Sequence, residues 1–348
     1  MLVLDAAAVR QALPMDAAIK AMRRAFAALS AGRAIVPMRS QISIRQHDGV
    51  SLVMPAFVDD AEGQSLAVKV VSLFDRNAGR GLPRIQSAVL VLSPDTGQPL
   101  ALLEGAALTA IRTGAASGLA TDLLARPRVR TAAMLGAGVQ ARTQLQAVCA
   151  VRPIETVWVY DPDPAAVEAF ILDMVAAARL RPLPPATARA VPVPGWPAAA
   201  TDIRPASTPR QAVAEADVIC AATTSRTPVF ADTDLAAGVH INAVGSYQPD
   251  VREVPTETVV RARVFVDSRE AALHEAGDLI QPIRQGAITA DHILAELGEL
   301  VLGRAAGRSC AADVTLFKAV GVAVQDAVAA MAALDRAMRL GIGQTVSW

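Results

Sequence analysis

The chain reads AAMLGAGVQA at positions 132–141, and this stretch predicts more about the fold than any other. Apolar residues lead directly into the pattern Gly-x-Gly-x-x-Ala, and a helical pattern follows over 142–150. Glycines in this pattern permit a tight turn and a close approach of the backbone to a pyrophosphate, while the small third residue lets a helix pack on a strand. The start of the helix adds N–H groups and positive partial charge. The stretch therefore predicts a dinucleotide-binding turn; the alternative is a purely structural strand–turn–helix connection.

A second predicted strand strengthens this interpretation. It covers 156–160, where the sequence reads TVWVY, and Asp161 follows it directly. An acidic residue at this position hydrogen-bonds a ribose in dinucleotide-binding folds, and its charge repels a 2′-phosphate. Pro162 and Asp163 add no basic residue that could bind this phosphate. The sequence therefore favours NAD(H), with NADP(H) left open.

Composition excludes several classes of partner. The 348 residues are 53% hydrophobic and 19% charged, and the formal net charge is zero. Proteins that bind nucleic acids or membrane surfaces carry an excess of basic residues, and this chain has no such excess. No apolar run approaches the roughly 20 residues of a membrane span, and the start of the chain lacks a signal-peptide pattern. Three cysteines lie far apart without metal-ligand spacing, so we expect buried thiols, no metal and a soluble cytoplasmic protein.

Element patterns change twice along the chain. The region up to about 125 reads as α+β, and strands alternate with helices from about 130 to 270, which is typical of a doubly wound sheet. The predicted elements are helices at 15–31, 106–125, 290–302 and 314–340, and strands at 39–45, 49–56, 66–74, 85–92, 99–104, 131–135, 156–160, 218–221, 240–244 and 264–266. The Pro- and Ala-rich stretch 181–209 is expected to be a long loop around one short strand.

These patterns predict an α/β protein with an inserted domain. A Rossmann dinucleotide-binding domain at 126–313 would lie within an α+β domain formed by 1–125 and 314–348.

Lys69 is a candidate functional residue because lysine is rare here. The chain contains only Lys20, Lys69 and Lys318 beside thirty arginines. Lys20 fits an exposed helix position, whereas Lys69 lies within the strand-like run SLAVKVVSLF at 65–74. A charge in such a strand needs a partner or a function. The alternative is an edge strand whose lysine reaches water.

Six segments together resemble the ornithine cyclodeaminase/mu-crystallin family. They are VMPA at 53–56, VKVV at 68–71, LTAIRT at 108–113, LGAGVQA at 135–141, NAVG at 242–245 and DVTLFKAVG at 313–321. Their order matches the family, and they extend over nearly the whole chain. The resemblance implies a homodimer with a Rossmann domain for NAD(H) or NADP(H). It also implies that the other domain, 1–125 with 314–348, binds the substrate and forms the dimer, and that the chemistry is hydride transfer at the α-carbon of an amino acid or its imine.

The resemblance also assigns site residues. Arg39, Lys69 and Arg112 match basic residues around a substrate carboxylate, which arginine can bind with two hydrogen bonds. Lys69 is the catalytic candidate, and the substrate-binding candidates are Arg39, Lys69, Arg112, Tyr247 and Val320. The cofactor-binding candidates are Arg112, Gly136, Gly138, Val139, Gln140, Asp161, Thr223, Asn242, Val244 and Gly245. Four of these assignments also have a plainer interpretation. Arg39 could be a surface arginine, Arg112 could form an ion pair on a helix face, Thr223 could be a turn residue, and 242–245 could be an ordinary strand end.

Three positions depart from the cyclodeaminase pattern. Cyclodeaminases of the family carry an aspartate two residues past the NAVG motif, where this chain has Tyr247. An acidic residue before Met54 is also missing, because Leu52 or Val53 stands there. A δ-amino group would therefore lack its carboxylate partners. Arg84 replaces a threonine found in many relatives, and the sequence assigns it no role.

The leading hypothesis is an NAD(P)H-dependent reductase of a cyclic α-imino acid. Its substrate would be Δ1-pyrroline-2-carboxylate or Δ1-piperideine-2-carboxylate, giving L-proline or L-pipecolate. Arg39 and Arg112 would hold the carboxylate, and Lys69 would contact it or help keep the imine protonated. One alternative is an ornithine cyclodeaminase or an alanine-type amino-acid dehydrogenase. Another is a non-catalytic, nucleotide-dependent binding protein like mu-crystallin.

Overall fold

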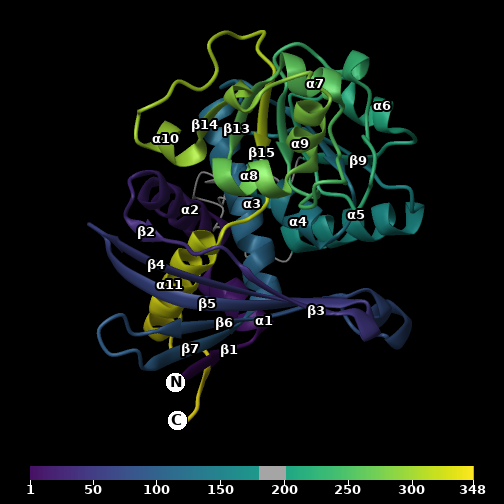
Figure 1. The fold of residues 1–348 in the computed structure, drawn as a ribbon. Helices are drawn as coiled ribbons and strands as arrows, with labels where there is room; N and C mark the ends of the chain where they lie inside the picture. Colours follow the sequence, from purple (N-terminus) through teal and green to yellow (C-terminus); the bar gives the residue numbers. More distant parts are fainter. Residues whose placement is uncertain (180–200, 348) are drawn as a thin grey trace, which may run out of the picture. The chain divides into compact units, whose positions relative to one another are not determined.

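The computed structural model describes residues 1–179 and 201–347. The chain forms two compact units, one of residues 1–112 and 321–348 and one of residues 113–320 (Figure 1). The second unit is therefore inserted into the sequence of the first.

A mixed sheet forms the centre of the first unit. Its strands are β1 (Leu2–Leu4), β2 (Ala34–Ile35), β3 (Ser40–Ile44), β4 (Gly49–Asp60), β5 (Gly63–Phe74), β6 (Ile85–Leu92), β7 (Pro99–Glu104) and β16 (Gln344–Thr345). Their order is β16-β1-β7-β6-β5-β4-β2, and β3 also pairs with β4. The pairing of β1 with β7 is parallel and the others are antiparallel. Because β1 pairs with β16, the two ends of the chain lie side by side (Figure 1).

Helices cover one face of this sheet. They are α1 (Ala6–Ala12), α2 (Met15–Ser30) and α11 (Ala323–Leu340), with short 3-10 turns η1 (Arg45–His47) and η2 (Asp75–Arg80) in the strand connections. Helix α11 packs on β4, β5 and β6, and both α1 and α2 pack against α11. Side chains alternate between the faces of a strand, so Met54, Lys69 and Val89, which are register neighbours, are all buried on this inner face.

The second unit contains a sheet in which every pairing is parallel. Its strands are β8 (Thr131–Leu135), β9 (Thr156–Tyr160), β10 (Asp202–Pro205), β11 (Val218–Ala221), β12 (His240–Ala243), β13 (Arg263–Val266), β14 (Ile293–Glu296) and β15 (Thr315–Lys318). The order is β10-β9-β8-β11-β12-β15-β13-β14. The first five strands in this order follow the Rossmann pattern, in which the chain returns to the centre of the sheet and continues in the opposite direction.

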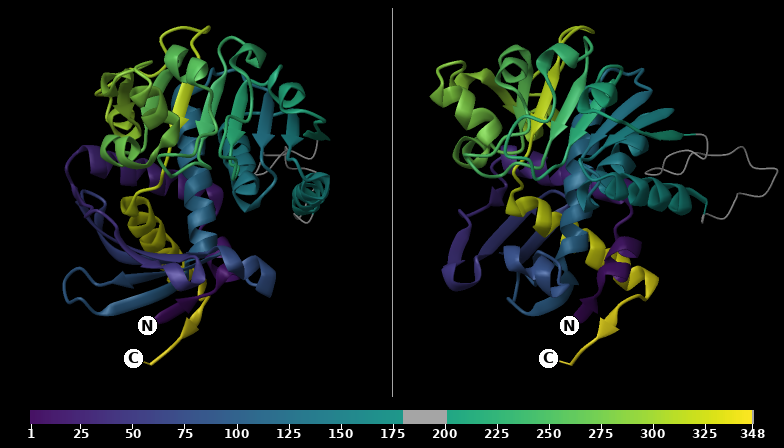
Figure 2. Two further views of the ribbon diagram at one scale, coloured as in Figure 1. Left: turned by 45° about the vertical axis from the view of Figure 1, so that its right-hand side comes forward. Right: turned by 90° about the vertical axis from the view of Figure 1, so that its right-hand side faces the viewer.

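Two hydrophobic cores lie on the two faces of this parallel sheet. One contains Met134, Val157 and Val218 with Leu145 and Phe170 from helices. The other contains the alternate strand residues, such as Ala133, Leu135 and Ile219, with other helices. Figure 2 shows helices on both sides of the sheet. The helices are α3 (Gly105–Leu124), which begins in the first unit, α4 (Val139–Val151), α5 (Pro164–Arg179), α6 (Pro209–Val213), η3 (Asp232–Asp234), α7 (Thr256–Arg261), α8 (Arg269–Glu275), α9 (Gly277–Arg284), η4 (Ala290–His292) and α10 (Leu297–Val301).

The division of the chain differs from the boundaries expected at 125 and 314. Residues 113–125 belong to the second unit, where Ala125 joins a core. Residues 314–320 also belong there, because β15 pairs with β12 and β13.

Two predicted helices are wrong in part. The helix expected at 290–302 contains strand β14, which pairs with β13, and α10 begins only after it. A capping box between Glu296 and Glu299 fixes this late start. The helix expected from 314 begins instead at Ala323, because the first residues form β15 and Gly321, with φ of 85°, turns the chain.

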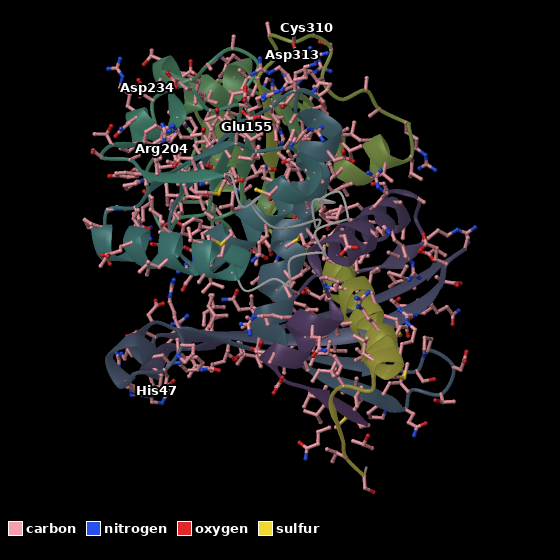
Figure 3. The ribbon with its side chains drawn as sticks, turned by 180° about the vertical axis from the view of Figure 1, so that it is seen from behind. His47, Glu155, Arg204, Asp234, Cys310 and Asp313 are labelled. Atoms are coloured by element: carbon pink, nitrogen blue, oxygen red, sulfur yellow. The ribbon has the colours of Figure 1, made fainter. Side chains whose placement is uncertain are left out.

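Three smaller expectations have mixed outcomes. Lys20 is exposed, as expected, but Cys310 (labelled in Figure 3) is exposed rather than buried, with its Sγ 3.0 Å from Asp313 Oδ1. In the Pro- and Ala-rich segment, β10 is the short strand, whereas residues 180–200 lie outside the described residues. No helix within the described residues is long and apolar enough to cross a membrane.

Candidate active site

The glycine turn lies between β8 and α4 in the second unit. Gly136 has φ of 94°, and its N–H donates to the Tyr160 carbonyl at 2.8 Å. A Cβ at Gly136 would lie 2.7 Å from the Ala222 carbonyl oxygen, so only glycine fits. Gly138 is the N-cap of α4, and nothing lies within 4 Å of a Cβ built there. The turn is therefore closed on the protein side and open where a phosphate would approach the helix N-terminus.

Asp161 follows β9 and holds the glycine turn. Its Oδ2 accepts from the Ala137 N–H at 2.9 Å, and its Oδ1 accepts from the Asp163 N–H at 3.0 Å. A carboxylate has about four lone-pair sites, so these two bonds leave acceptor capacity for ribose hydroxyls. Asp161 therefore fixes the turn and can still bind a ligand.

A pocket of about 510 Å³ lies at the carboxyl ends of these strands. Gly136, Gly138, Asp161 and Thr223 are among the residues that line it. It lies where β8 has β9 on one side and β11 on the other, the position at which strand order reverses and open α/β sheets bind ligands. A second hollow of about 540 Å³ shares Tyr160 and Asp161 with it and extends along α5. Together the two hollows suit an elongated ligand such as a dinucleotide.

Glu253 joins two strand-end loops beside this pocket. Its Oε1 accepts from the Thr223 N–H and hydroxyl at 2.7 and 2.8 Å, and its Oε2 accepts from the N–H groups of Gly245 and Ser246 at 2.7 and 3.1 Å. Burial raises the pKa of Glu253, and Lys318 opposes this increase. One buried carboxylate thus fixes the loops after β11 and β12 with four hydrogen bonds.

A second set of buried charges supports Glu253. Asp278 Oδ1 accepts from the N–H groups of Glu253 and Val254 at 2.7 and 2.8 Å. The Nζ of Lys318 lies 2.9 Å from Asp278 Oδ2 and donates to the Ser246 carbonyl at 2.6 Å. These contacts leave Lys318 with a structural role in the loops.

Asn242 has its side chain in the core of the second unit. Its Nδ2 donates to Thr121 Oγ1 at 3.0 Å, and its Oδ1 lies 3.2 Å from His240 Nε2. Burial lowers the pKa of His240 to about 3, so this histidine is neutral. These contacts place the Asn242 side chain in the core, and the backbone after it leads to the loop at Gly245. The predicted contact of Asn242 with the cofactor stays a prediction.

The first unit contains a buried charge cluster. Lys69 on β5 and Arg112 on α3 both contact Asp326 on α11: Lys69 Nζ lies 2.6 Å from Oδ2, and Arg112 Nε donates to Oδ1 at 3.1 Å. Arg112 Nη1 also donates to Gln325 Oε1 at 2.8 Å. We call Lys69, Arg112, Gln325 and Asp326 the Lys69 cluster. Because β5 pairs with both β4 and β6, the edge-strand interpretation of Lys69 is wrong.

Arg39 reaches the same part of the first unit. It is partly buried, and its Nη2 donates to the Gly321 carbonyl at 3.0 Å. A Cβ at Gly321 would lie 3.0 Å from Arg112 Nη1, so the Gly321 turn lies directly against Arg112. The three basic residues predicted to bind a carboxylate are therefore grouped around α11 and the turn before it.

Burial and charge set the protonation of the cluster. Burial lowers the pKa of Lys69 to about 8; Asp326 opposes this decrease, while Arg112 and Arg39 add to it. Burial alone would raise the pKa of Asp326, but Arg112 and Lys69 outweigh it and hold that pKa below its usual value. Asp326 is therefore ionised, and two cations share its charge.

A model of the ornithine cyclodeaminase/mu-crystallin family matches residues 1–180 and 192–340. The chain belongs to this family. A Δ1-pyrroline-2-carboxylate reductase from Bacillus cereus is 37% identical, with 100% of both chains covered. The family and the α/β fold expected from the sequence are thereby confirmed.

Solved structures of family members share the whole fold. Thermococcus litoralis Δ1-pyrroline-2-carboxylate reductase, in complex with NADH and L-proline, is 41% identical and has a TM-score of 0.89, covering 99% of this chain and 100% of that chain. An archaeal alanine dehydrogenase dimer with bound NAD is 27% identical and has a TM-score of 0.86, covering 100% and 99%.

The remaining predicted site residues, and Arg84, differ in how far they are buried. Tyr247 is 36% exposed, and Val139, at the start of α4, is 69% exposed. The Val320 N–H donates to Asp267 Oδ2 at 3.0 Å. Arg84 is exposed and pairs with Asp75 at 2.6 Å. Gln140 and Val244 are partly buried next to the glycine turn and Gly245, respectively.

Asp326 and Glu253 are not among the site residues that the sequence predicts. Gln325 and Asp326 are polar residues in a helix otherwise rich in alanine and valine, which could have indicated a buried polar pair. Glu253 gives no comparable signal, because it lies in an irregular stretch between Pro249 and Pro255.

Proposed function

We propose that this chain reduces Δ1-pyrroline-2-carboxylate to L-proline with NADH. The observation that carries the proposal is the Lys69 cluster, in which two buried cations share one carboxylate. Such a cluster has a net positive charge and favours an anionic ligand. The 37% and 41% identical relatives named above, both reductases of this imino acid, support the choice of substrate.

The chain's own residues would bind and orient the imino acid. Arg39 and Arg112 would hold its carboxylate, because guanidinium groups bind carboxylates with paired hydrogen bonds. Lys69 would donate to the carboxylate or to the imine nitrogen. Protonation at that nitrogen makes the imine carbon a better hydride acceptor. Fixing this orientation before reaction is the main contribution of such a site.

The glycine pocket would hold the cofactor. The open N-terminus of α4 at Gly138 fits a pyrophosphate, and the remaining acceptor capacity of Asp161 fits ribose hydroxyls and disfavours a 2′-phosphate. When bound, NADH supplies the hydride. Thr223 and Gly245, fixed by Glu253, would complete the nicotinamide end of the pocket.

The test is cofactor oxidation by the purified protein. We expect loss of NADH absorbance with Δ1-pyrroline-2-carboxylate in buffer free of ammonium, and formation of L-proline. Δ1-Piperideine-2-carboxylate belongs in the same assay, because one ring methylene is worth only roughly 1–3 kcal/mol of discrimination. Absence of turnover with both imines would reject the proposal.

A second candidate is an amino-acid dehydrogenase, which the likeness to the archaeal alanine dehydrogenase favours. It differs in one requirement: reduction of pyruvate depends on added ammonium, whereas a preformed cyclic imine needs none. A cyclodeaminase is disfavoured by Tyr247, which replaces the expected aspartate. Ornithine with NAD⁺ is the matching assay.

We also propose that the first unit forms a homodimer through the outer face of its sheet. Register neighbours on this face are apolar and not fully buried: Pro55, Val68, Leu90 and Leu102 form one row across four strands. Val53 and Val70 form part of the next row, and Val70 is 42% exposed. Large exposed apolar faces mark association sites, and the archaeal relative is a dimer.

A further inference from the structure

Asp326 contacts both cations of the Lys69 cluster, yet the proposed reaction gives it no role. It lies in the first turn of α11, and its side chain is 2% exposed. Its two oxygens are divided between Lys69 and Arg112. Gln325, its neighbour, accepts from Arg112 Nη1 and from the Val322 N–H at 3.0 Å, so the start of the helix is tied to the same arginine.

The surroundings of Lys69 give Asp326 its importance. The register neighbours of Lys69 on β4 and β6 are Met54 and Val89, which are apolar and buried. The charged groups that act on Lys69 are Arg112 from α3, Arg39 from the segment before β3 and Asp326 from α11. Of these, only Asp326 is negative. A buried lysine beside two other cations loses its proton unless a carboxylate compensates.

We propose that Asp326 is a positioning residue that keeps Lys69 protonated and fixes Arg112 beside it, so that the site offers two charged donors to an anionic imino acid. The proposal rests on the proposed function for its substrate. The inference about the protonation state of Lys69 is independent of the proposed function, because that state can be measured without turnover. Removal of a buried carboxylate from between two cations leaves both charges uncompensated, which is costly. Replacement of Asp326 should therefore have a large effect on Lys69 and Arg112.

The chain allows a direct measurement, because it contains only three lysines. Protein labelled with ¹³C at the lysine ε-carbon should give three lysine signals, and Lys20→Arg and Lys69→Arg variants assign them. We expect the Lys69 signal of the wild-type protein to be that of an ammonium at pH 7, with a midpoint near 8. A neutral Lys69 at pH 7 in the wild-type protein would overturn the proposal.

The variant Asp326→Asn tests the cause. Without the carboxylate the pKa of Lys69 should fall by about 1–3 units, the usual effect of a close opposite charge. If the ammonium form is the active one, activity is lost as pH rises through this pKa, so the alkaline limb of kcat/KM should move to lower pH by the same amount. Asp326→Glu keeps the charge, so its shift should be smaller than that of Asp326→Asn in both measurements.

Asp60→Asn is the matched control. Asp60 is also a carboxylate of the first unit in an ion pair, with Arg24 at 2.9 Å, away from Lys69. This variant should leave the Lys69 midpoint and the alkaline limb unchanged. A lower rate at every pH in Asp326→Asn, with an unmoved Lys69 midpoint, would show a merely structural role. If the wild-type protein reduces no imine but Asp326→Asn still shifts the Lys69 midpoint, the proposed function is rejected and this inference stands.

Discussion

Single residues of the site differ in how far the sequence can identify them. Lys69 is identifiable because lysine is rare in this chain and this one interrupts an apolar run. Asp326 is not, since its importance depends on contact with residues far away in the sequence. Asn242 lies in a family motif, but its side-chain amide is hydrogen-bonded inside the core, so its predicted contact with the cofactor stays a prediction. A motif identifies a position, whereas hydrogen-bond partners decide what the side chain does there.

Cofactor choice is a prediction at the scale of one residue. Replacing Asp161 by serine removes a charge that would repel a 2′-phosphate, so the preference for NADH over NADPH should fall roughly tenfold or more, as expected for one repulsion of about 1.4 kcal/mol. The ratio of kcat/KM values for the two cofactors measures this. Asp163→Ser, which changes an exposed neighbour, should leave the ratio unaltered. An unchanged ratio in Asp161→Ser would remove the argument for NAD(H).

At the scale of elements, long or strongly patterned segments are predictable. The strands at 85–92, 99–104, 131–135, 156–160 and 218–221 match the structure, because apolar runs there end at turns or polar residues. The short strands β14 and β15 are not predicted. A run of only four residues fits a helix as well as a strand, and only pairing with β13 decides between them. That pairing depends on distant parts of the chain, which a local pattern does not contain.

Loop fixation by Glu253 gives a prediction at this scale. In Glu253→Gln one acceptor oxygen becomes a donor, so the loop after β11 or the loop after β12 loses its acceptor and keeps buried, unpaired N–H groups. Each such group costs about 1–3 kcal/mol, so the Kd for NADH should rise roughly tenfold or more. Fluorescence titration of NADH measures it. The control is Glu155→Gln, an exposed glutamate of the same unit labelled in Figure 3. Equal affinity in both variants would count against a positioning role for Glu253.

At the scale of the whole molecule, the inserted order of the chain is expected from where the glycine turn lies. The apolar outer face of the first sheet is not expected from the sequence, because its side chains alternate with buried ones on the same strands. Val68 and Val70, whose side chains lie on this face, flank Lys69 on β5. Binding of a second copy there would cover apolar surface and also stiffen the strand that carries the lysine.

Leu90→Glu tests this dimer face. A charge in the middle of an apolar row, between Val68 and Leu102, would be buried without a partner on association. We therefore expect a dimer for the wild-type protein, as proposed, and a monomer for the variant. Size-exclusion chromatography with light scattering gives the mass directly. Met338→Glu is the matched control: it also places a charge on an exposed apolar residue of the first unit, but on α11, away from the sheet face. A Leu90→Glu protein that keeps the dimer mass would move the interface elsewhere. If it is monomeric with unchanged Lys69 titration, association through this sheet is separate from the charge balance of the site.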